Sequence, residues 1–312
     1  MKNKVLTGLL LVLIGGWGSL SAQSAGSNYS RQVNTLIGTK GVGLTSGYLY
    51  PGATYPYGMV QFTPSYFSKR SGFVINQLSG GGCEHMGNFP TFPVKGKLKM
   101  SPDNILNYRI NISEEKGHAG YYEAMVQEDI KAKLTVTERT GMASYEYPAD
   151  QQYGTVIIGG GISATPIEQA AIVITAPNKC EGYAEGGNFC GLRTPYKVYF
   201  VAEFDTDALE SGTWKRNELK PNTTFAEGEY SGVYFTFDVN KKKNIQYKIG
   251  VSYVSVENAR ENLKAENTGW DFLQIQNQAE SKWNHYLGKI EVEGTNPDRT
   301  TQFYTHQIGR AS

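Results

Sequence analysis

The sequence is short of cysteine and histidine, the residues that most often bind zinc or carry redox chemistry. It has 312 residues but only three cysteines and four histidines. No Cys-x-x-Cys pair and no His-Glu-x-x-His motif occurs, so the pattern does not favour a zinc site. The Gly-x-Ser-x-Gly nucleophile elbow and the phosphate-binding P-loop are also absent. These absences give no support to a zinc enzyme, to a serine hydrolase with that elbow or to a P-loop nucleotidase.

Charge is equally scarce. The formal net charge is +1, and charged residues make up 19% of the chain. The longest basic run is residues 241–243, between two strand-like segments, where a solvated turn is expected. We therefore expect no nucleic-acid partner, because nucleic acids are bound through many basic side chains. With 39% hydrophobic residues, the chain can form a packed core in one large domain or two ordinary ones.

One apolar run stands near the N-terminus. Residues 5–14 are almost wholly apolar, follow Lys2 and Lys4, and precede small residues with a plausible cleavage point after Ala22. This pattern predicts a secretion signal over residues 1–22. The run is too short for a membrane span, and no cysteine before Cys83 could carry a lipid anchor. The mature protein is expected to be periplasmic or secreted.

The middle of the chain alternates apolar and polar residues with period two, the pattern of strands that have one buried face. Turn residues separate these segments, and no helical pattern intervenes. This predicts a mainly β fold in which antiparallel sheets stack as a β-sandwich over residues 23–254. The clearest strand patterns cover residues 130–137, 155–158, 196–204, 233–239 and 245–253.

The period changes after Ser255. Apolar residues at helical spacing predict one helix from Val256 to a stop at residues 267–269, and a second from Trp270 to Gly288. A brief strand is expected over residues 289–292. Asn296 is the predicted cap of a last helix. We divide the region into a helical linker over residues 255–294 and the aborted start of a helical domain over residues 295–312.

The three cysteines leave their pairing open. Cys180 and Cys190 flank a glycine-rich segment that we interpret as a loop, and an oxidising compartment would permit a bridge between them. Cys83 would then remain single. Equally, all three could be buried thiols.

Residues 78–90 form the most distinctive loop. Three glycines precede Cys83, Glu84 and His85, and Asn88 stands near the exit. Glycine lets the backbone approach a ligand closely, and loops carry function more often than the scaffold beneath them. We interpret the segment as presenting polar groups into a cleft. The alternative is a tight surface turn in which Cys83 is a small buried hydrophobe.

Several stretches together resemble the N-terminal part of glycoside hydrolase family 92, the exo-acting α-mannosidases. Each is short, but they occur in the family's order and span nearly the whole mature chain. The matching stretches are residues 33–38, 50–64, 78–90, 117–122, 134–141 and 299–304.

The resemblance implies a supersandwich-like β-sandwich joined through an α-helical linker to an (α/α)6 barrel. It further implies cleavage of terminal α-mannose from glycans with inversion, a Ca²⁺ ion that contacts the sugar, and two acidic groups as general acid and base. In the family these groups and the Ca²⁺ ligands lie in the barrel, beyond residue 312. We therefore carry over no catalytic residue and no metal ligand, and we expect this chain to hold a truncated barrel start.

Sandwich loops help to shape the substrate cleft of the family. On that basis the expected substrate-binding residues are Cys83, Glu84, His85 and Asn88. The residues near the tip of the Cys180–Cys190 segment, Glu185 and Asn188, are weaker candidates, and His118 is expected to be a turn residue. The favoured hypothesis is part of an α-mannosidase that is inactive alone. Rivals are a non-catalytic carbohydrate-binding module and a purely structural domain.

Overall fold

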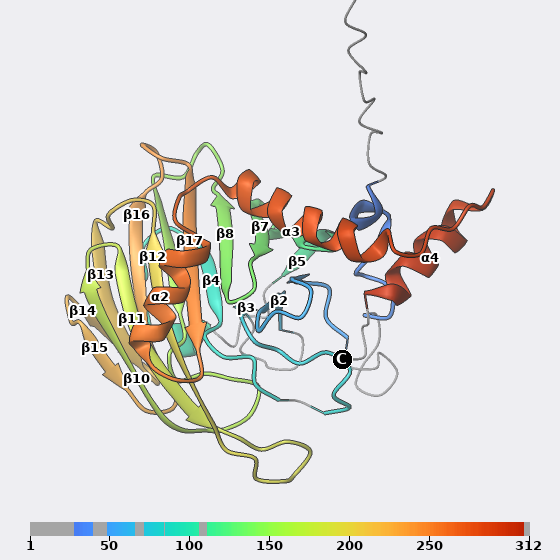
Figure 1. The fold of residues 1–312 in the computed structure, drawn as a ribbon. Helices are drawn as coiled ribbons and strands as arrows, with labels where there is room; N and C mark the ends of the chain where they lie inside the picture. The colour runs from blue at the N-terminus through green and yellow to red at the C-terminus, as the bar shows by residue number, and fades with distance from the viewer. Residues whose placement is uncertain (1–27, 40–48, 66–71, 84, 106–110, 309–312) are drawn as a thin grey trace, which may run out of the picture.

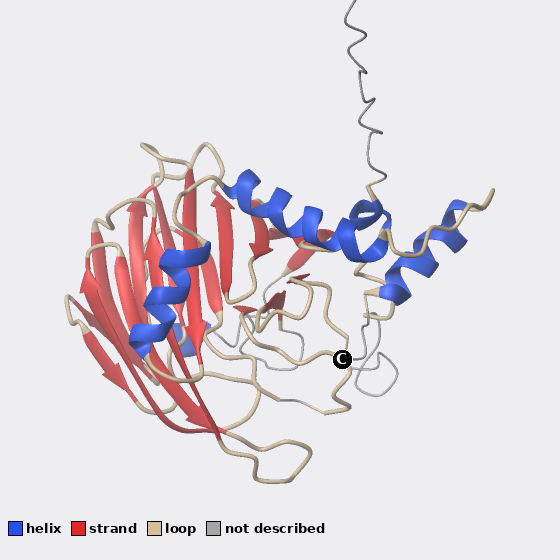
Figure 2. Cartoon of the chain, in the orientation of Figure 1, coloured by secondary structure: helices blue, strands red, loops and turns tan. Residues whose placement is uncertain are grey.

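The computed structural model of the protein describes residues 28–39, 49–65, 72–83, 85–105 and 111–308. Two antiparallel sheets dominate these residues and face each other (Figures 1 and 2). The expectation of a mainly β fold with stacked antiparallel sheets is confirmed. The predicted signal, residues 1–22, and the candidate Glu84 lie outside the described residues.

The first sheet has eight strands and the second has nine. Every pair of neighbouring strands is antiparallel. In spatial order the first sheet contains β1 (Ala53–Thr54), β2 (Gln61–Pro64), β3 (Phe73–Val74), β4 (Thr91–Lys95), β9 (Tyr153–Ile158), β16 (Ser231–Asp238), β13 (Glu210–Lys215) and β14 (Glu218–Pro221). The second contains β15 (Phe225–Glu227), β10 (Ile167–Ala176), β11 (Lys179–Gly186), β12 (Tyr196–Phe204), β17 (Asn244–Ser252), β8 (Thr140–Glu146), β7 (Ile130–Val136), β6 (Tyr121–Val126) and β5 (Ile112–His118).

The core lies between the two sheets, because alternate side chains of each strand point inward. Phe204 of β12 shows how the layers interlock: its ring centroid lies 4.9 Å from that of Phe235 in the opposite sheet. It also lies 5.3 Å from that of Tyr247 in its own sheet. Such tilted aromatic contacts add to the free energy gained by burying apolar area.

Strand β11 corrects the expectation of a glycine-rich loop after Cys180. Its inward positions, among them Cys180, Gly182 and Ala184, are buried, while the outward ones are only partly so. The inward residues are small because the neighbouring strand is close: a Cβ on Gly182 would lie 2.1 Å from the carbonyl oxygen of Ala171. Buried and partly exposed positions therefore alternate along β11, but its buried positions hold small residues.

The helices of the described residues are α1 (Pro102–Ile105), α2 (Val256–Glu266), α3 (Phe272–Leu287) and α4 (Pro297–Gln307), with a short 3-10 helix, η1 (Tyr29–Gln32). Helix α2 covers the outer face of the nine-stranded sheet, and α3 leads from the sandwich to η1 and α4 (Figure 1). Side-chain caps start α2, α3 and α4, because Ser255, Asp271 and Asn296 each accept a hydrogen bond from a backbone N–H of the first turn.

One expectation for the C-terminal region needs correction. Residues 289–292 form no strand; they are an irregular connection between α3 and α4. Helix α4 follows its predicted cap and continues to Gln307. Buried Tyr304 explains its docking, since its ring lies 5.2 Å from that of Tyr29 in η1.

Candidate functional site

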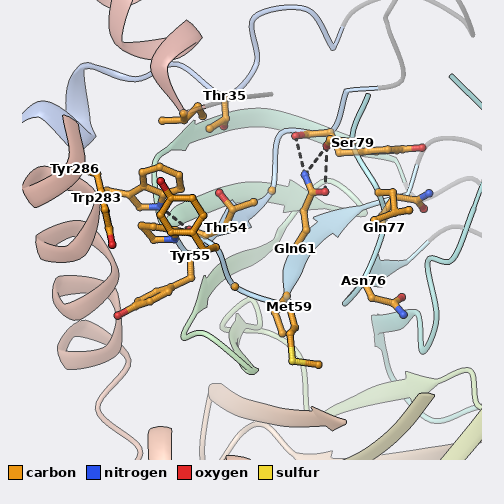
Figure 3. A pocket seen from close by; sticks show the side chains of 18 of the residues that line it. Thr35, Thr54, Tyr55, Met59, Gln61, Asn76, Gln77, Ser79, Trp283 and Tyr286 are labelled. Carbon is orange, nitrogen blue, oxygen red and sulfur yellow. Dashed lines mark hydrogen bonds between the residues drawn. The ribbon is translucent and has the colours of Figure 1, made fainter. Parts of the chain in front are cut away.

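A cavity of about 900 Å³ lies where the sandwich meets the helices that follow it. Its volume falls in the range of small-molecule sites. Residues 50–61 form one wall, residues 76–79 with Met86 form a second, and α3 with the chain after it forms a third (Figure 3). The cavity thus depends on segments that are more than 200 residues apart in the sequence.

The helical wall is aromatic. Trp283 and Tyr286 project from α3 toward Tyr55, as Figure 3 shows. The indole N–H of Trp283 donates a hydrogen bond to the Thr54 carbonyl oxygen at 2.7 Å, which fixes the ring against the β1 segment. Tyr57 is 88% exposed and meets the edge of Tyr286, with ring centroids 5.3 Å apart. Aromatic faces are therefore presented at the mouth of the cavity.

The opposite wall is polar and uncharged. The Gln61 amide donates to Ser79 Oγ at 2.7 Å, and that hydroxyl donates back to Gln61 Oε1 at 3.1 Å. The Gln77 amide donates to the His85 carbonyl oxygen at 2.8 Å. Gln77 Oε1 is buried and has no hydrogen-bond partner among the described residues. This oxygen faces Gly87, where an added Cβ would lie only 2.4 Å from it, so the glycine leaves room for the buried amide.

A buried carboxylate holds α3 in place beside the cavity. Glu280 accepts hydrogen bonds from His118 Nε2 at 2.9 Å, from the Gln276 amide at 2.6 Å and from Arg31 Nε at 3.1 Å. Burial alone would raise the pKa of this carboxyl, but these hydrogen bonds outweigh burial and lower the pKa to about 2. His118 is the last residue of β5, so the hydrogen-bond network joins the nine-stranded sheet, η1 and α3. The expectation that His118 is only a turn residue is therefore wrong.

The electrostatics of the cavity suit a neutral polar ligand. Lys289 is the one charged residue of its lining among the described residues. Burial, with a smaller contribution from the nearby Glu138 and Glu266 carboxylates, raises the pKa of Tyr55, so its phenol stays protonated at neutral pH. Amides, hydroxyls and aromatic rings bind sugar hydroxyls and sugar faces without any charge. The described lining contains no carboxylate, so it offers no general acid or base pair of the glycosidase type.

The sequence-predicted residues of the 78–90 loop lie beside the cavity, mostly facing away from it. His85 is 7% exposed, and its ring meets the edges of Phe189 and Tyr196 at centroid distances of 4.8 and 5.6 Å. Burial lowers the pKa of His85, against an opposing backbone hydrogen bond with Asn188, so the imidazole is neutral at pH 7.

Asn88 is fully buried and supports its neighbours. Its side-chain oxygen accepts hydrogen bonds from the Asn76 amide at 3.1 Å and from the Tyr196 hydroxyl at 2.9 Å. Its backbone N–H donates to Asn76 Oδ1 at 2.7 Å. Neither His85 nor Asn88 lines the cavity, whereas Asn76, Gln77 and Met86 do. Substrate binding by these predicted residues stays a hypothesis.

The disulfide joins Cys83 to Cys190, across 107 residues, and not Cys180 to Cys190. Cys180 remains a buried thiol in β11, and burial raises its pKa well above the usual range. The reason is the strand that separates the two cysteines: Cys180 lies near one end of β11, whereas Cys190 lies beyond the other end, in the β11–β12 loop. Glu185, a weaker candidate, pairs with Lys197 on the sheet surface.

Sequence reasoning missed the residues that line the cavity most directly. Gln61 and Ser79 stand in the stretches 50–64 and 78–90 that resemble the family, but nothing in the sequence marks either residue as a ligand. Gln77 lies in neither stretch, and the apolar spacing that places Trp283 and Tyr286 on a helix predicts no cavity. A signal was present in the Tyr- and Pro-rich stretch over residues 50–58, which supplies Tyr55 and Tyr57. Their meeting with α3 depends on tertiary contacts that the sequence does not display.

The described residues were also searched for metal-binding clusters and for membrane-spanning helices. No group of three or more His, Cys, Asp or Glu side chains among them is placed to hold a metal ion. None of the helices seen in the described ranges has both the length and the apolar character of a membrane span.

Comparison with protein families decides the relationship. The N-terminal domain of glycosyl hydrolase family 92 matches residues 32–252. The chain belongs to glycoside hydrolase family 92. The catalytic domain of family 92 matches residues 258–307. The cavity therefore lies between the two matched regions: Gln61 and Gln77 belong to the first, and Trp283 and Tyr286 belong to the second. Tyr253 directly follows the first region.

Individual relatives agree with this family 92 membership. An uncharacterized secreted glycosidase of Arthroderma benhamiae is 26% identical over 302 residues, which cover 84% of this chain and 38% of the relative. The family 92 α-mannosidase BT3965 of Bacteroides thetaiotaomicron is 24% identical with a TM-score of 0.76, over 90% of this chain and 41% of that one.

A second solved structure shows the same fold. The family 92 inverting mannosidase BT2199 of Bacteroides thetaiotaomicron is 23% identical with a TM-score of 0.74, over 89% of this chain and 38% of that one. BT3965 has also been solved in complex with mannoimidazole. The chain thus spans about two fifths of the length of these relatives.

Proposed function

We propose that this chain forms the sandwich and linker of an exported, calcium-dependent, inverting exo-α-mannosidase. In this proposal the cavity between them binds the terminal mannose of α-mannoside glycans. The observation that carries the proposal is the position of the cavity, at the junction of the two regions that match family 92. The solved structures with this fold that are named mannosidases support the same substrate class.

The chemistry of the cavity supports binding of a neutral sugar. The exposed Tyr57 ring and the Tyr286 ring offer apolar faces for the C–H side of a pyranose. Gln61 and Ser79, which line the cavity, offer hydrogen bonds to hydroxyl groups. Apart from Lys289, the described lining is uncharged, so its amides and hydroxyls suit the neutral hydroxyl groups of mannose.

We place the catalytic chemistry outside the residues of this chain. An inverting glycosidase needs an acid and a base about 6.5–9.5 Å apart, and the described lining supplies neither. Calcium prefers six to eight oxygen ligands, and the described residues contain no donor cluster of this kind. They do not fit a calcium site, so the metal of the proposed enzyme would be held elsewhere. The secreted relative and the predicted signal support export.

Mannose release and sugar binding test this function. We expect the purified chain to release no mannose from 4-nitrophenyl α-mannoside or α-mannobiose, with calcium or with a chelator. We expect methyl α-mannoside to bind more tightly than methyl α-glucoside, with a dissociation constant of about a millimolar, because only part of the binding site is present. Tyr57→Ala should weaken this binding. Tyr199→Ala, which changes a tyrosine of β12 outside the cavity lining, is the matched control.

A non-catalytic carbohydrate-binding module is the second candidate. The aromatic and amide lining without carboxylates favours it, because such a surface binds sugar without any chemistry. This candidate predicts saturable glycan binding at about micromolar concentration and no mannose release under any condition. Equal binding of mannoside and glucoside would count against the mannosidase assignment.

A further inference from the structure

The loop over residues 78–90 has a strained backbone. Five of its residues have positive φ: Gly80 (74°), Gly82 (75°), Met86 (56°), Gly87 (72°) and Phe89 (55°). Glycine adopts this region freely, but Met86 and Phe89 carry side chains that disfavour it. Such a conformation persists only when surrounding contacts hold it.

The second half of the loop is held by packing. Phe89 is buried, and its ring centroid lies 4.2 Å from that of Phe200. Asn88 and Asn76 exchange two hydrogen bonds. The Met86 carbonyl oxygen accepts a hydrogen bond from the Ala164 N–H at 2.7 Å. These contacts would hold residues 85–90 in place without a covalent link.

The first half of the loop has few such contacts. Residues 78–83 are exposed or half-exposed. Ser79 pairs with Gln61, and Cys83 is bonded to Cys190. No backbone N–H of these six residues takes part in a turn or loop hydrogen bond among the described residues. The disulfide is therefore the strongest restraint on this half.

The far end of the disulfide is exposed, but its own turn is hydrogen-bonded. Cys190 lies in the turn of the β11–β12 hairpin, where Phe189 and Leu192 exchange two backbone hydrogen bonds of 2.8 and 2.9 Å. The Phe189 ring packs against His85 of the loop. The hairpin continues two strands of the nine-stranded sheet, so the bridge ties the loop to the sandwich itself.

We propose that the Cys83–Cys190 disulfide is a positioning clamp for the cavity wall. Leu78, Ser79 and Met86 line the cavity, and the bridge lies between them in the chain. Breaking it releases residues 78–83 and disorders that wall, while the packing of residues 85–90 and of the sandwich persists. Only the assignment of a glycan to the cavity rests on the proposed function; the clamp itself does not.

Limited proteolysis tests the clamp without any sugar. Chymotrypsin cuts after exposed leucine where the backbone can unfold locally. Leu78 is 42% exposed, and Leu209, 54% exposed at the other end of β12, serves as the internal control. Fragments are measured by mass after denaturation and reduction. The C83S/C190S double variant should be cut at Leu78 at least tenfold faster than the wild type, with cutting at Leu209 unchanged. Cys180→Ala, which keeps the bridge, should behave like the wild type.

Chemical reduction provides a second test on the unmodified chain. Dithiothreitol gives two electrons and two protons to the Cys83–Cys190 bond, forming two thiols, and becomes its own cyclic disulfide. Reduction should reproduce the fast cut at Leu78, and reoxidation should restore protection in the wild type but not in the double variant. Unchanged cutting at Leu78, or equally faster cutting at Leu209, would overturn the clamp. Either result would leave the mannoside proposal intact, because neither measurement involves a sugar.

Discussion

Replacing Glu280 with glutamine should loosen α3 from the sandwich. The substitution keeps the shape of the side chain but removes the charge that three hydrogen-bond donors share. A fall of the carboxyl pKa from 4.5 to about 2 corresponds to roughly 3 kcal/mol, at about 1.36 kcal/mol per unit. The Arg31 side chain is 55% exposed, so solvent screens part of this energy. We expect a loss of about 2 kcal/mol at pH 7.

The pH dependence provides an independent check on the charge. Because folding lowers the pKa of Glu280, its contribution is fully present above pH 4.5 and is lost as the pH falls from 4.5 toward 2. The difference in free energy of unfolding between the wild type and Glu280→Gln should therefore shrink as the pH falls through that window. Above pH 5 the contribution of the Glu280 carboxyl to the free energy of unfolding should stay constant.

Denaturant unfolding followed by tryptophan fluorescence and circular dichroism measures the effect. Glu168→Gln is the matched control, because Glu168 pairs with Arg193 at 3.1 Å on the surface, with side chains 41% and 74% exposed. The control should change the free energy of unfolding by less than about 0.5 kcal/mol. Equal stability of Glu280→Gln and the wild type at pH 7 would refute the reasoning, as would a difference that persists undiminished at pH 3.

Two further predictions concern backbone packing and acid sensitivity. Gly120→Ala should destabilise the protein by about 1–3 kcal/mol in the same unfolding assay, because φ is +90° and the new Cβ would lie 2.9 Å from that of Ala279 on α3. Gly269→Ala, with open space around it, should cost far less, and equal losses would contradict this packing. Because burial lowers the pKa of His85, its contribution to stability is present above pH 6.5 and is lost as the pH falls below it. The free energy of unfolding should therefore fall between pH 7 and pH 5 by more in the wild type than in His85→Phe, and a parallel fall in both proteins would contradict this.

Several strands of the sandwich could be predicted from the sequence, because large apolar residues occupy every second position along them. Strands β12, β16 and β17 were predicted from Phe, Tyr, Val and Ile at every second position. Strand β11 was missed because Gly182 and Gly186 stand at inward positions, where the neighbouring strand leaves no room for a larger residue. Period-two patterning is visible only when the buried positions bear large apolar side chains.

The candidate site could be predicted in part. Leu78, Ser79 and Met86 of the 78–90 loop line the cavity, but which residues of the loop face it depends on the left-handed backbone at Met86 and Phe89. The cysteine pairing could not be predicted, since loop conformation decides which sulfurs meet. The wall that α3 forms could not be predicted either, because it depends on the hydrogen bond from Trp283 to the Thr54 carbonyl, a contact across 229 residues.

The most direct measurement follows the indole N–H of Trp283 during a titration with methyl α-mannoside. This group points at Thr54 in the cavity wall, whereas the buried Trp214 belongs to β13 in the sandwich. In nitrogen-15 spectra, assigned with Trp283→Phe, we expect the Trp283 signal to shift in a saturable manner while the Trp214 signal stays in place. An unmoved Trp283 signal at saturating sugar, or an equal shift on methyl α-glucoside, would contradict a mannose-binding cavity between sandwich and linker.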